Sequence, residues 1–253
     1  MANGDINPPP IEHERLAFVK TDVTQWAELR ELFKHANKLH GRIDHVFANA
    51  GIAGRANYLE DRFDDHGELL EPSALTLDIN LKAVINTCYI GLHYMRKQTR
   101  VGGSIVLTAS GSSFQRFRVA DYTTAKHGVL GFMRGMIPNL QAAELPIRIN
   151  ALAPSWTLTG LVPEAMVNAF GDAVQTPDVV ARSAAVLMAD KSRQGQMIYS
   201  VTGRFFEIEE GMLLKTTKEI VGEVGDDKIV QHLLEMQSRA QHNPEEEITG
   251  NVV

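Results

Sequence analysis

Tyr122 and Lys126 are the two residues whose types and spacing first suggest chemistry. They lie four positions apart, so on a helix their side chains share one face. A nearby ammonium group favours the phenolate and lowers the pKa of a tyrosine from about 10 toward the working range. The pair is therefore a candidate general acid or base. By itself it also fits an ordinary surface helix, because the chain holds five tyrosines.

Polar residues at the ends of β-type runs strengthen the chemical interpretation. Ser110 ends one run, twelve residues before Tyr122, and Asn49-Ala50-Gly51 ends the preceding run. The following run, 148–153, stops at Pro154. Ligands of open α/β sheets bind at the carboxyl ends of the strands. We therefore expect these polar groups to converge on one rim of a sheet.

Short β-type runs alternate with amphipathic helical stretches, which indicates an α/β fold with a parallel sheet. Strands are predicted at 16–20, 43–48, 104–109, 148–153 and 196–201, and helices at 26–39, 72–97, 121–141 and 176–189. Residues 1–15 are predicted to be a disordered start, 16–208 the catalytic domain, and 209–253 a C-terminal helical tail. Within the tail, we expect a helix over 226–240 and disorder in the last ten residues.

Composition narrows the class of protein. With 253 residues, 44% of them apolar, the chain is long enough for one core. The net charge of −6 without a basic stripe argues against a nucleic-acid partner. The single cysteine, Cys88, fits a reducing compartment. No apolar stretch approaches about 18 residues, which argues against a membrane span. We expect a cytoplasmic protein that acts on a small molecule.

An ordered set of these residues resembles the short-chain dehydrogenase/reductase family over roughly residues 16–208. The set is Asp22, Asn49-Ala50-Gly51, Asn80, Ser110, Tyr122, Lys126 and the segment 150–154. The segments 67–70, 114–117 and 126–129 resemble those of fungal members similar to 15-hydroxyprostaglandin dehydrogenase, which often act in secondary metabolism. The resemblance implies a Rossmann-like, doubly wound parallel sheet. It also implies an NAD(P)-dependent oxidoreductase that interconverts a secondary alcohol and a ketone.

The resemblance assigns roles to four catalytic residues. Tyr122 would exchange a proton with the substrate oxygen, and Ser110 would hydrogen-bond the same oxygen. Lys126 would tune Tyr122 and hold the nicotinamide ribose, and Asn80 would anchor the water of a proton relay. In a shifted loop, either of the next two serines, Ser112 or Ser113, could replace Ser110.

The implied cofactor is NAD or NADP. The residues that the resemblance places against it are Asp22 and Val23 at the adenine, Asn49, Ala50 and Gly51 on the adenosine ribose side, Lys126 at the nicotinamide ribose, Thr159 at the nicotinamide amide, and Lys82, Tyr122 and Thr157 as further cofactor-side candidates.

The chain departs from the family at its start. It has no strand followed by Thr-Gly-x-x-x-Gly-x-Gly, the turn whose backbone N–H groups approach the pyrophosphate. In the family, an acidic or basic residue after the second strand selects NAD or NADP. The sequence pattern shows no counterpart of this residue. We therefore expect an N-terminally truncated sheet that lacks the first two strands and the glycine-rich turn. The strand at 16–20 is expected to dock directly beside the strand at 43–48, because unpaired ladder groups are costly.

Two interpretations of the function follow from this departure. The chain is either an oxidoreductase whose true start lies upstream, or a truncated homologue that does not bind the cofactor. The second class includes a cofactor-free isomerase or lyase that uses Tyr122, and a non-catalytic partner of a full-length paralogue. Helices 72–97 and 121–141 correspond to those through which family members pair, so a homo-oligomer is expected.

Overall fold

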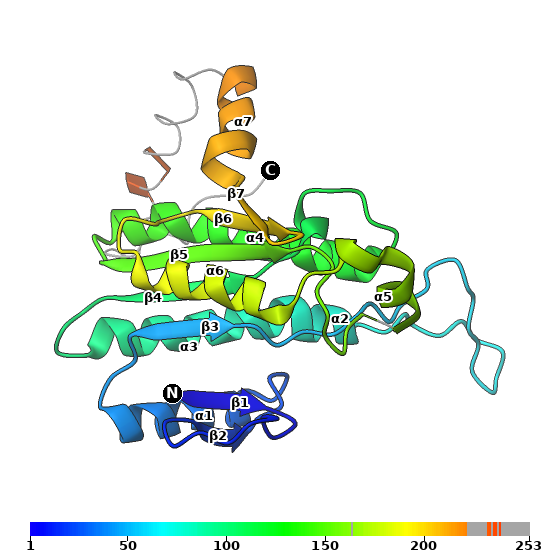
Figure 1. Cartoon of the computed structure of the whole chain (residues 1–253), viewed down its shortest axis with the longest axis horizontal. Coiled ribbons are helices and arrows are strands. Elements are labelled where there is room, and N and C mark those ends of the chain that lie inside the picture. Colours follow the sequence, from blue (N-terminus) through cyan, green and yellow to red (C-terminus); the bar gives the residue numbers. More distant parts are fainter. Residues whose placement is uncertain (163, 222–231, 234, 237, 239–253) are drawn as a thin grey trace, which may run out of the picture.

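The carboxyl ends of four parallel strands form the edge that carries the predicted site. A computed structural model describes residues 1–162, 164–221, 232, 233, 235, 236 and 238. Its larger sheet contains β3 (His45–Ala48), β4 (Gly103–Thr108), β5 (Ile147–Pro154), β6 (Met197–Val201) and β7 (Arg204–Glu207), in that spatial order. The first four strands are parallel, and β7 pairs antiparallel with β6. In register, His45 lies opposite Ser104 and Gly103 opposite Ile147. Figure 1 shows the strands pointing toward one side of the molecule.

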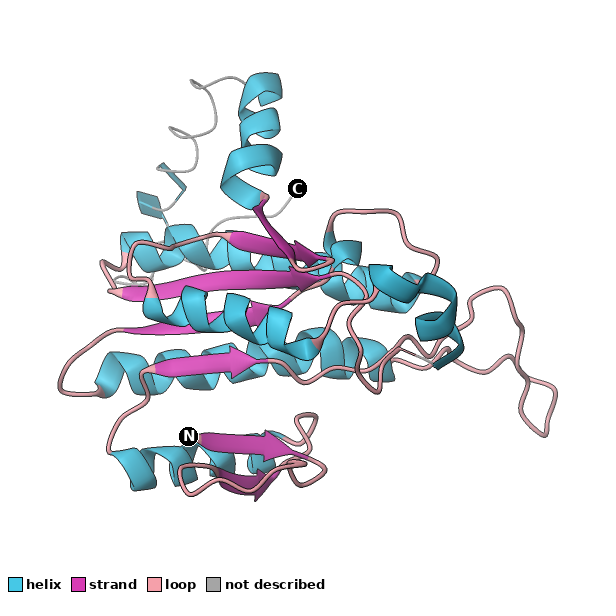
Figure 2. Cartoon of the chain, viewed as in Figure 1, coloured by secondary structure: helices cyan, strands magenta, loops and turns pink. Residues whose placement is uncertain are grey.

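Helices cover both faces of this sheet, which confirms the α/β prediction (Figure 2). Alternate strand residues divide between two cores, as the two-residue period of a strand requires. Ile105 and Leu107 pack in the cluster that contains buried residues of α3 (Ala83–Lys97) and α4 (Ala120–Ala142). Val106 and Leu152 face the opposite way and pack against α6 (Pro177–Ala189). All of these side chains are essentially excluded from water.

The predicted helix at 72–97 is not uniform. It consists of α2 (Leu75–Leu77), the π-helical segment η1 (Asp78–Lys82) and α3. A π-helical turn adds a residue to the helix repeat and often marks a functional site. Asn80 lies inside this segment and is fully buried.

The remaining elements are short. Three of them, η2 (Gly111–Ser113), α5 (Glu164–Phe170) and η3 (Gly171–Ala173), lie in the segments that follow β4 and β5. The chain continues after β7 into η4 (Glu209–Leu213) and α7 (Leu214–Val221). The helix predicted over 226–240 and the disorder predicted for the last ten residues fall almost entirely outside the residues that the structure describes.

The N-terminal part differs most from the sequence-based expectation. Ala2–Asp5 forms strand β1, so the prediction of a disordered start is wrong there. β1 pairs in parallel with β2 (Ala17–Lys20), and α1 (Trp26–His40) packs on both strands. Gly4 allows the close approach of α1, because a Cβ atom there would overlap the Leu32 side chain.

The direct docking of β2 beside β3 is also wrong, because β1 and β2 form a sheet of their own. In Figure 1, β1 lies on the side of β2 that faces β3, so β1 occupies the edge through which β2 would have docked. A strand was therefore overlooked before residue 16, and the sequence pattern could not reveal it. Only one of its four side chains is apolar, and the backbone pairing with β2 defines it.

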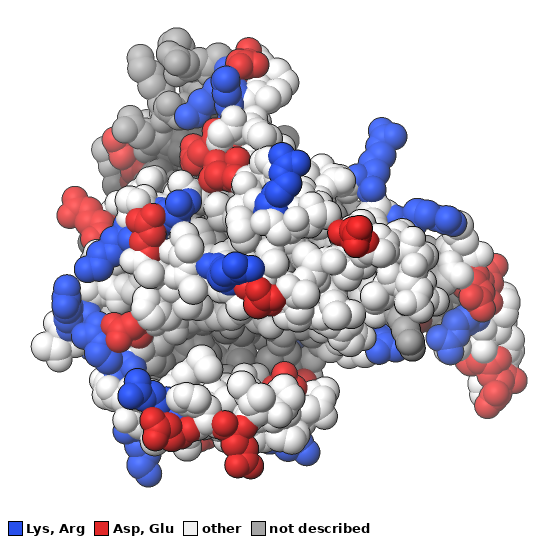
Figure 3. All heavy atoms as spheres, viewed as in Figure 1, with Lys and Arg blue, Asp and Glu red and all other residues white. Residues whose placement is uncertain are grey.

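The face of the molecule seen in Figure 3 shows no concentration of one charge sign among the described residues. On the face seen in Figure 3, lysine and arginine side chains alternate with aspartate and glutamate. Among the described residues, no helix is long and apolar enough to cross a membrane.

Candidate active site

Ser110 and Tyr122 lie together at the carboxyl end of β4. Ser110 caps η2, where its Oγ accepts a hydrogen bond from the Ser112 backbone N–H at 3.2 Å. Tyr122 lies in the first turn of α4, and the Ser110 hydroxyl is close enough to lower the pKa of the phenol. Burial has the larger effect, so the pKa of Tyr122 is raised above its ordinary value.

The neighbouring serines do not take the place of Ser110. The Ser113 hydroxyl donates to the Lys126 carbonyl at 2.7 Å and accepts from the Ser110 backbone N–H at 3.1 Å. Ser112 is buried beneath the loop. Ser110 is therefore the serine whose side chain faces Tyr122.

Lys126 is buried, and its Nζ donates to the Thr108 carbonyl at 2.7 Å. Nζ lies 5.7 Å from the centre of the Tyr122 ring, over its face. Burial lowers the pKa of the Lys126 ammonium to about 8. The structure thus confirms that the two side chains share a face, but it does not show the expected lowering of the Tyr122 pKa. The reason is that burial has the largest effect on the pKa of both groups, and the group that lowers the pKa of the phenol is the Ser110 hydroxyl.

A chain of hydrogen bonds connects the site to the next strand. The Thr108 hydroxyl donates to Asn49 Oδ1 at 2.9 Å, while the Thr108 carbonyl accepts from Lys126. The Asn-Ala-Gly turn after β3 is thereby joined to the end of β4 and to α4. These groups converge on one rim, as the order of the residues predicted.

Asn80 holds the loop that follows this turn. Its Oδ1 accepts from the Ile52 backbone N–H and its Nδ2 donates to the Ile52 carbonyl, both at 2.8 Å. A Cβ atom on Gly51 would lie 3.3 Å from Asn80 Oδ1, so the small residue permits this approach. Both ends of the Asn80 amide therefore position the backbone at Ile52.

Of the predicted adenosine-side residues, Asp22 and Val23 lie in the loop between β2 and α1, and Lys82 ends η1. The Asp22 carboxylate accepts from the backbone N–H and the hydroxyl of Thr24, at 2.9 and 2.8 Å. Val23 and Lys82 line one surface pocket of about 230 Å³. Lys82 is exposed and forms an ion pair with Asp78 at 3.5 Å.

Thr157 and Thr159 follow β5 on the same rim. The Thr157 hydroxyl donates to the Ser155 carbonyl at 2.9 Å and accepts from Gln175 Nε2 at 3.2 Å. The Thr159 hydroxyl donates to the Thr157 carbonyl at 3.3 Å. Both side chains thus stabilise the loop, and within the described part of the chain neither forms a hydrogen bond with Tyr122 or Lys126.

Asp121 is a site residue that the sequence analysis missed. It is 1% exposed and directly precedes Tyr122. Its Oδ2 accepts from the backbone N–H groups of Arg55 and Ala56, at 2.8 and 3.0 Å, and its Oδ1 accepts from the Tyr122 N–H at 2.8 Å. Burial raises the pKa of this carboxyl, but the nearby Thr76 hydroxyl and the three backbone N–H groups lower it by more, so that the pKa lies below the ordinary aspartate value. An acidic residue in the first turn of a helix was the available signal.

Asp5 was missed because β1 was missed. It ends β1 beside the end of β2, where its backbone carbonyl accepts from the Thr21 N–H at 2.9 Å. Its side chain accepts from the Asn7 N–H and is exposed. An acidic side chain therefore stands at the end of β1, beside the end of β2.

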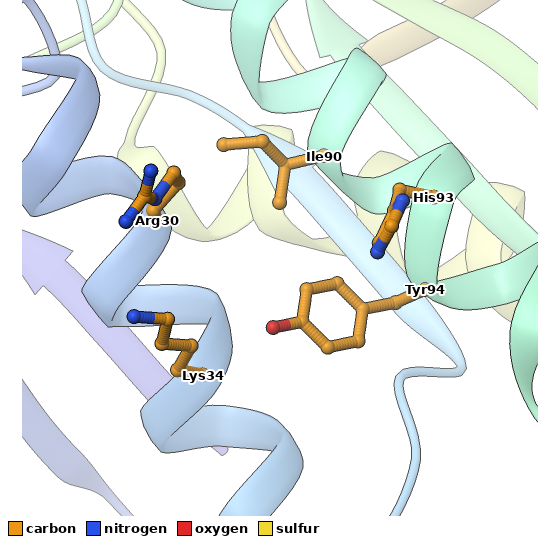
Figure 4. A pocket seen from close by; sticks show the side chains of 5 residues that line it. All are labelled: Arg30, Lys34, Ile90, His93 and Tyr94. Atoms are coloured by element: carbon orange, nitrogen blue, oxygen red, sulfur yellow. The ribbon is translucent and has the colours of Figure 1, made fainter.

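A second hollow lies away from this rim. It has a volume of about 210 Å³ and is lined by Arg30 and Lys34 of α1 and by Ile90, His93 and Tyr94 of α3 (Figure 4). Lys34 is paired with Glu31. The residues come from helix faces rather than from strand ends, so this pocket is separate from the row of site residues.

Comparisons with known proteins agree with this geometry. Residues 10–168 match the sequence model of the family described as short chain dehydrogenase. The short-chain dehydrogenase/reductase ascJ of Acremonium egyptiacum is 48% identical over 92% of this chain and 81% of its own length. The short-chain dehydrogenase/reductase prx4 of Penicillium roqueforti is 38% identical over 63% of this chain and 47% of its own length.

More distant similarities extend to characterised enzymes. Human 15-hydroxyprostaglandin dehydrogenase is 30% identical over 60% of this chain and 52% of its own length. The chain therefore spans about half the length of that relative and of prx4. The crystal structure of levodione reductase superposes with a TM-score of 0.62 and 26% identity, covering 74% of this chain and 76% of that one.

Proposed function

Because the chain belongs to the short-chain dehydrogenase/reductase family, we propose that it interconverts a secondary alcohol and a ketone in fungal secondary metabolism. The observation that carries the proposal is the convergence of Ser110, Tyr122 and Lys126 on one rim of the sheet. The proposed catalytic unit comprises residues 16–208 together with β1. The fungal relatives support the metabolic setting.

The residues on the rim fit the two ends of a nicotinamide dinucleotide. Asp22, Val23 and the Asn49–Gly51 turn would hold the adenosine end, and Lys126 and Thr159 would hold the nicotinamide end. The pyrophosphate between them has no glycine-rich turn to bind in the described chain. Nicotinamide supplies hydride transfer at the substrate carbon. This incomplete fit predicts weak binding of the cofactor by the 253-residue chain.

Asp5 favours NAD over NADP within this proposal. An acidic side chain at the end of such a strand can accept hydrogen bonds from the ribose hydroxyls of NAD. It would repel the additional phosphate of NADP. The exposed carboxylate of Asp5, next to the end of β2, is free to act in this way.

The chain's own residues carry the proton chemistry. During reduction, the Tyr122 hydroxyl donates its proton to the substrate oxygen while the Ser110 hydroxyl hydrogen-bonds the same oxygen. Because the pKa of Tyr122 is raised, the phenol is protonated at neutral pH and holds the proton that reduction requires. Asp121, through the Tyr122 backbone, and Asn80, through Ile52, hold the surrounding loops in place.

Turnover and binding measured together test this proposal. We expect NAD-dependent oxidation within a panel of secondary alcohols, and Tyr122→Phe should abolish it while leaving NAD affinity nearly unchanged. Tyr89→Phe is the matched control, since Tyr89 is exposed on α3. Calorimetric titration should give weaker binding of NADP than of NAD, and Asp5→Asn should reduce the difference. Turnover that survives Tyr122→Phe would contradict the assignment.

The missing glycine-rich turn favours a second candidate. Ser110 and Tyr122 could polarise a carbonyl without a nucleotide, as in an isomerase or lyase that moves a proton, or the chain could assist a full-length paralogue. Substrate conversion in nucleotide-free buffer, lost in Tyr122→Phe, would select the cofactor-free enzyme. An increase in NAD-dependent turnover when an upstream in-frame strand and glycine-rich turn are added would select the oxidoreductase.

We further propose a homo-oligomer that pairs through α3 and α4. Tyr89 on α3 is 61% exposed, which leaves much of its aromatic surface open although the ring also contacts Trp26 of α1. Sedimentation of the chain at tens of micromolar, the concentration range of a weak interface, should show a dimer or tetramer. A strict monomer would contradict it.

A further inference from the structure

Four aromatic rings touch in sequence, starting at the catalytic tyrosine. The ring centres of Tyr122 and Phe117 are 6.5 Å apart, those of Phe117 and Trp156 5.7 Å, and those of Trp156 and Phe170 4.9 Å. These spacings lie within the range of attractive ring contacts. We name the set Phe117, Trp156 and Phe170 the aromatic row.

The aromatic row is assembled from three separate segments. Phe117 lies in the loop before α4, Trp156 in the loop after β5, and Phe170 at the end of α5. Figure 1 shows α5 beside the carboxyl ends of the strands, the edge that carries Ser110 and Tyr122. The row is therefore an extension of the catalytic rim.

Packing alone does not account for the exposure of the row. Phe117 remains 40% exposed and Phe170 39%, and the flanking Leu158 and Leu161 are also exposed. Rings that served only to hold the loops together would gain by burying these faces. A contiguous apolar surface beside polar catalytic groups is the usual composition of a small-molecule site.

We propose that the aromatic row recognises a flat, conjugated ring attached to the substrate's reacting carbon. This inference rests on the proposed function and names the substrate class of the same site. A planar ring can stack on the exposed rings of Phe117 and Phe170, which flank Trp156, whereas a saturated ring presents hydrogens that keep it away from them. Because Tyr122 is in contact with Phe117, a carbonyl carried by such a ring lies toward the Tyr122 hydroxyl and Ser110. The substrate is thus an aryl or similarly conjugated ketone, or the corresponding alcohol.

A matched pair of ketones tests the proposal. Methyl naphthyl ketone and its saturated counterpart, methyl decalinyl ketone, share one carbon skeleton but differ in flatness. Calorimetric titration of the full chain should show the naphthyl ketone binding about tenfold more tightly, which corresponds to about 1.4 kcal/mol. Equal affinity for the two ketones would overturn the proposal.

Variants locate the binding. Phe117→Leu and Phe170→Leu keep apolar volume but remove a ring. Each should weaken the binding of the naphthyl ketone severalfold and leave the binding of the decalinyl ketone unchanged. Phe205→Leu is the control, because Phe205 is a comparably exposed phenylalanine on β7 outside the row. Loss of affinity in the control equal to that in the row variants would show non-specific adsorption and overturn the proposal.

Fluorescence gives an independent reading of position. The chain has two tryptophans, so a Trp26→Phe background leaves Trp156 as the emitter. The naphthyl ketone should change this emission with the same saturation curve as the calorimetry, and an unchanged emission would contradict binding at the row.

The failure of this proposal is distinguishable from failure of the proposed function. Tyr122→Phe retains a ring and should keep the preference for the naphthyl ketone while losing turnover. A preference without turnover in the unmodified chain would contradict the oxidoreductase function alone. If the chain turns over saturated and aryl ketones and binds them with equal affinity, this result would contradict the proposed role of the aromatic row alone.

Discussion

Replacement of Asp121 by asparagine should destabilise the fold, because one carboxylate serves three backbone N–H donors. Its Oδ2 accepts from Arg55 and Ala56 and its Oδ1 from Tyr122. An asparagine has one acceptor oxygen and one NH₂ group. Its NH₂ group must therefore point at a backbone N–H group, and two donors cannot form a hydrogen bond with each other. Each hydrogen bond to a charged group is worth about 1.5–3 kcal/mol, and a buried unsatisfied donor costs about 1–3 kcal/mol. We expect a loss of about 2–4 kcal/mol in the free energy of unfolding.

The pH dependence supplies the second measurement. The pKa of the Asp121 carboxyl is lowered in the folded chain, so its stabilisation is present above the ordinary aspartate pKa, about 3.9. It is lost as the pH falls through the lower folded value. The stability difference between the wild type and Asp121→Asn should therefore shrink in acid, as measured by urea unfolding at neutral and acidic pH.

A matched control separates this effect from a general charge effect. Asp65→Asn removes an exposed carboxylate from the same loop region and should change stability by no more than about 0.5 kcal/mol. If Asp121→Asn stays within the same limit, or if its penalty persists unchanged in acid, the three-donor arrangement does not stabilise the protein as reasoned.

Three further outcomes are expected. Gly54→Ala should lower the free energy of unfolding by about 1–3 kcal/mol, because the added Cβ atom would overlap Val119. Gly131→Ala is the control and should not destabilise the fold, because the space around Gly131 is open. Thermal unfolding of both variants checks this. Glu209→Gln removes the fully buried charge that pairs with Arg134 of α4, so the free energy of unfolding measured in urea should fall. A decrease of less than about 1 kcal/mol would contradict a structural role for the pair. The unfolding free energy of the wild type relative to Lys126→Met should rise between pH 8 and about 10.4. The reason is that the folded amine, with a pKa of about 8, loses its proton before the unfolded one; a flat difference would indicate an ordinary lysine.

The sequence alone determined most of the elements around the site. The periodicity of 121–141 and 176–189 predicted α4 and α6 within one or two residues, and β4, β5 and β6 were predicted equally closely. The order of Ser110, Tyr122 and Lys126 predicted their common rim. These features were readable because helix and strand periods are local, and because parallel strands bring their carboxyl ends to the same edge.

Only the tertiary structure decided the rest. Ala2–Asp5 has almost no apolar pattern, and its pairing with Ala17–Lys20 makes it a strand. The direction of the Lys126 ammonium depends on the Thr108 carbonyl, and its pKa depends on burial. Phe117 and Phe170 are 53 positions apart in the chain, yet both contact Trp156. Pairing, burial and ring contacts arise between segments distant in sequence, and no local period encodes them.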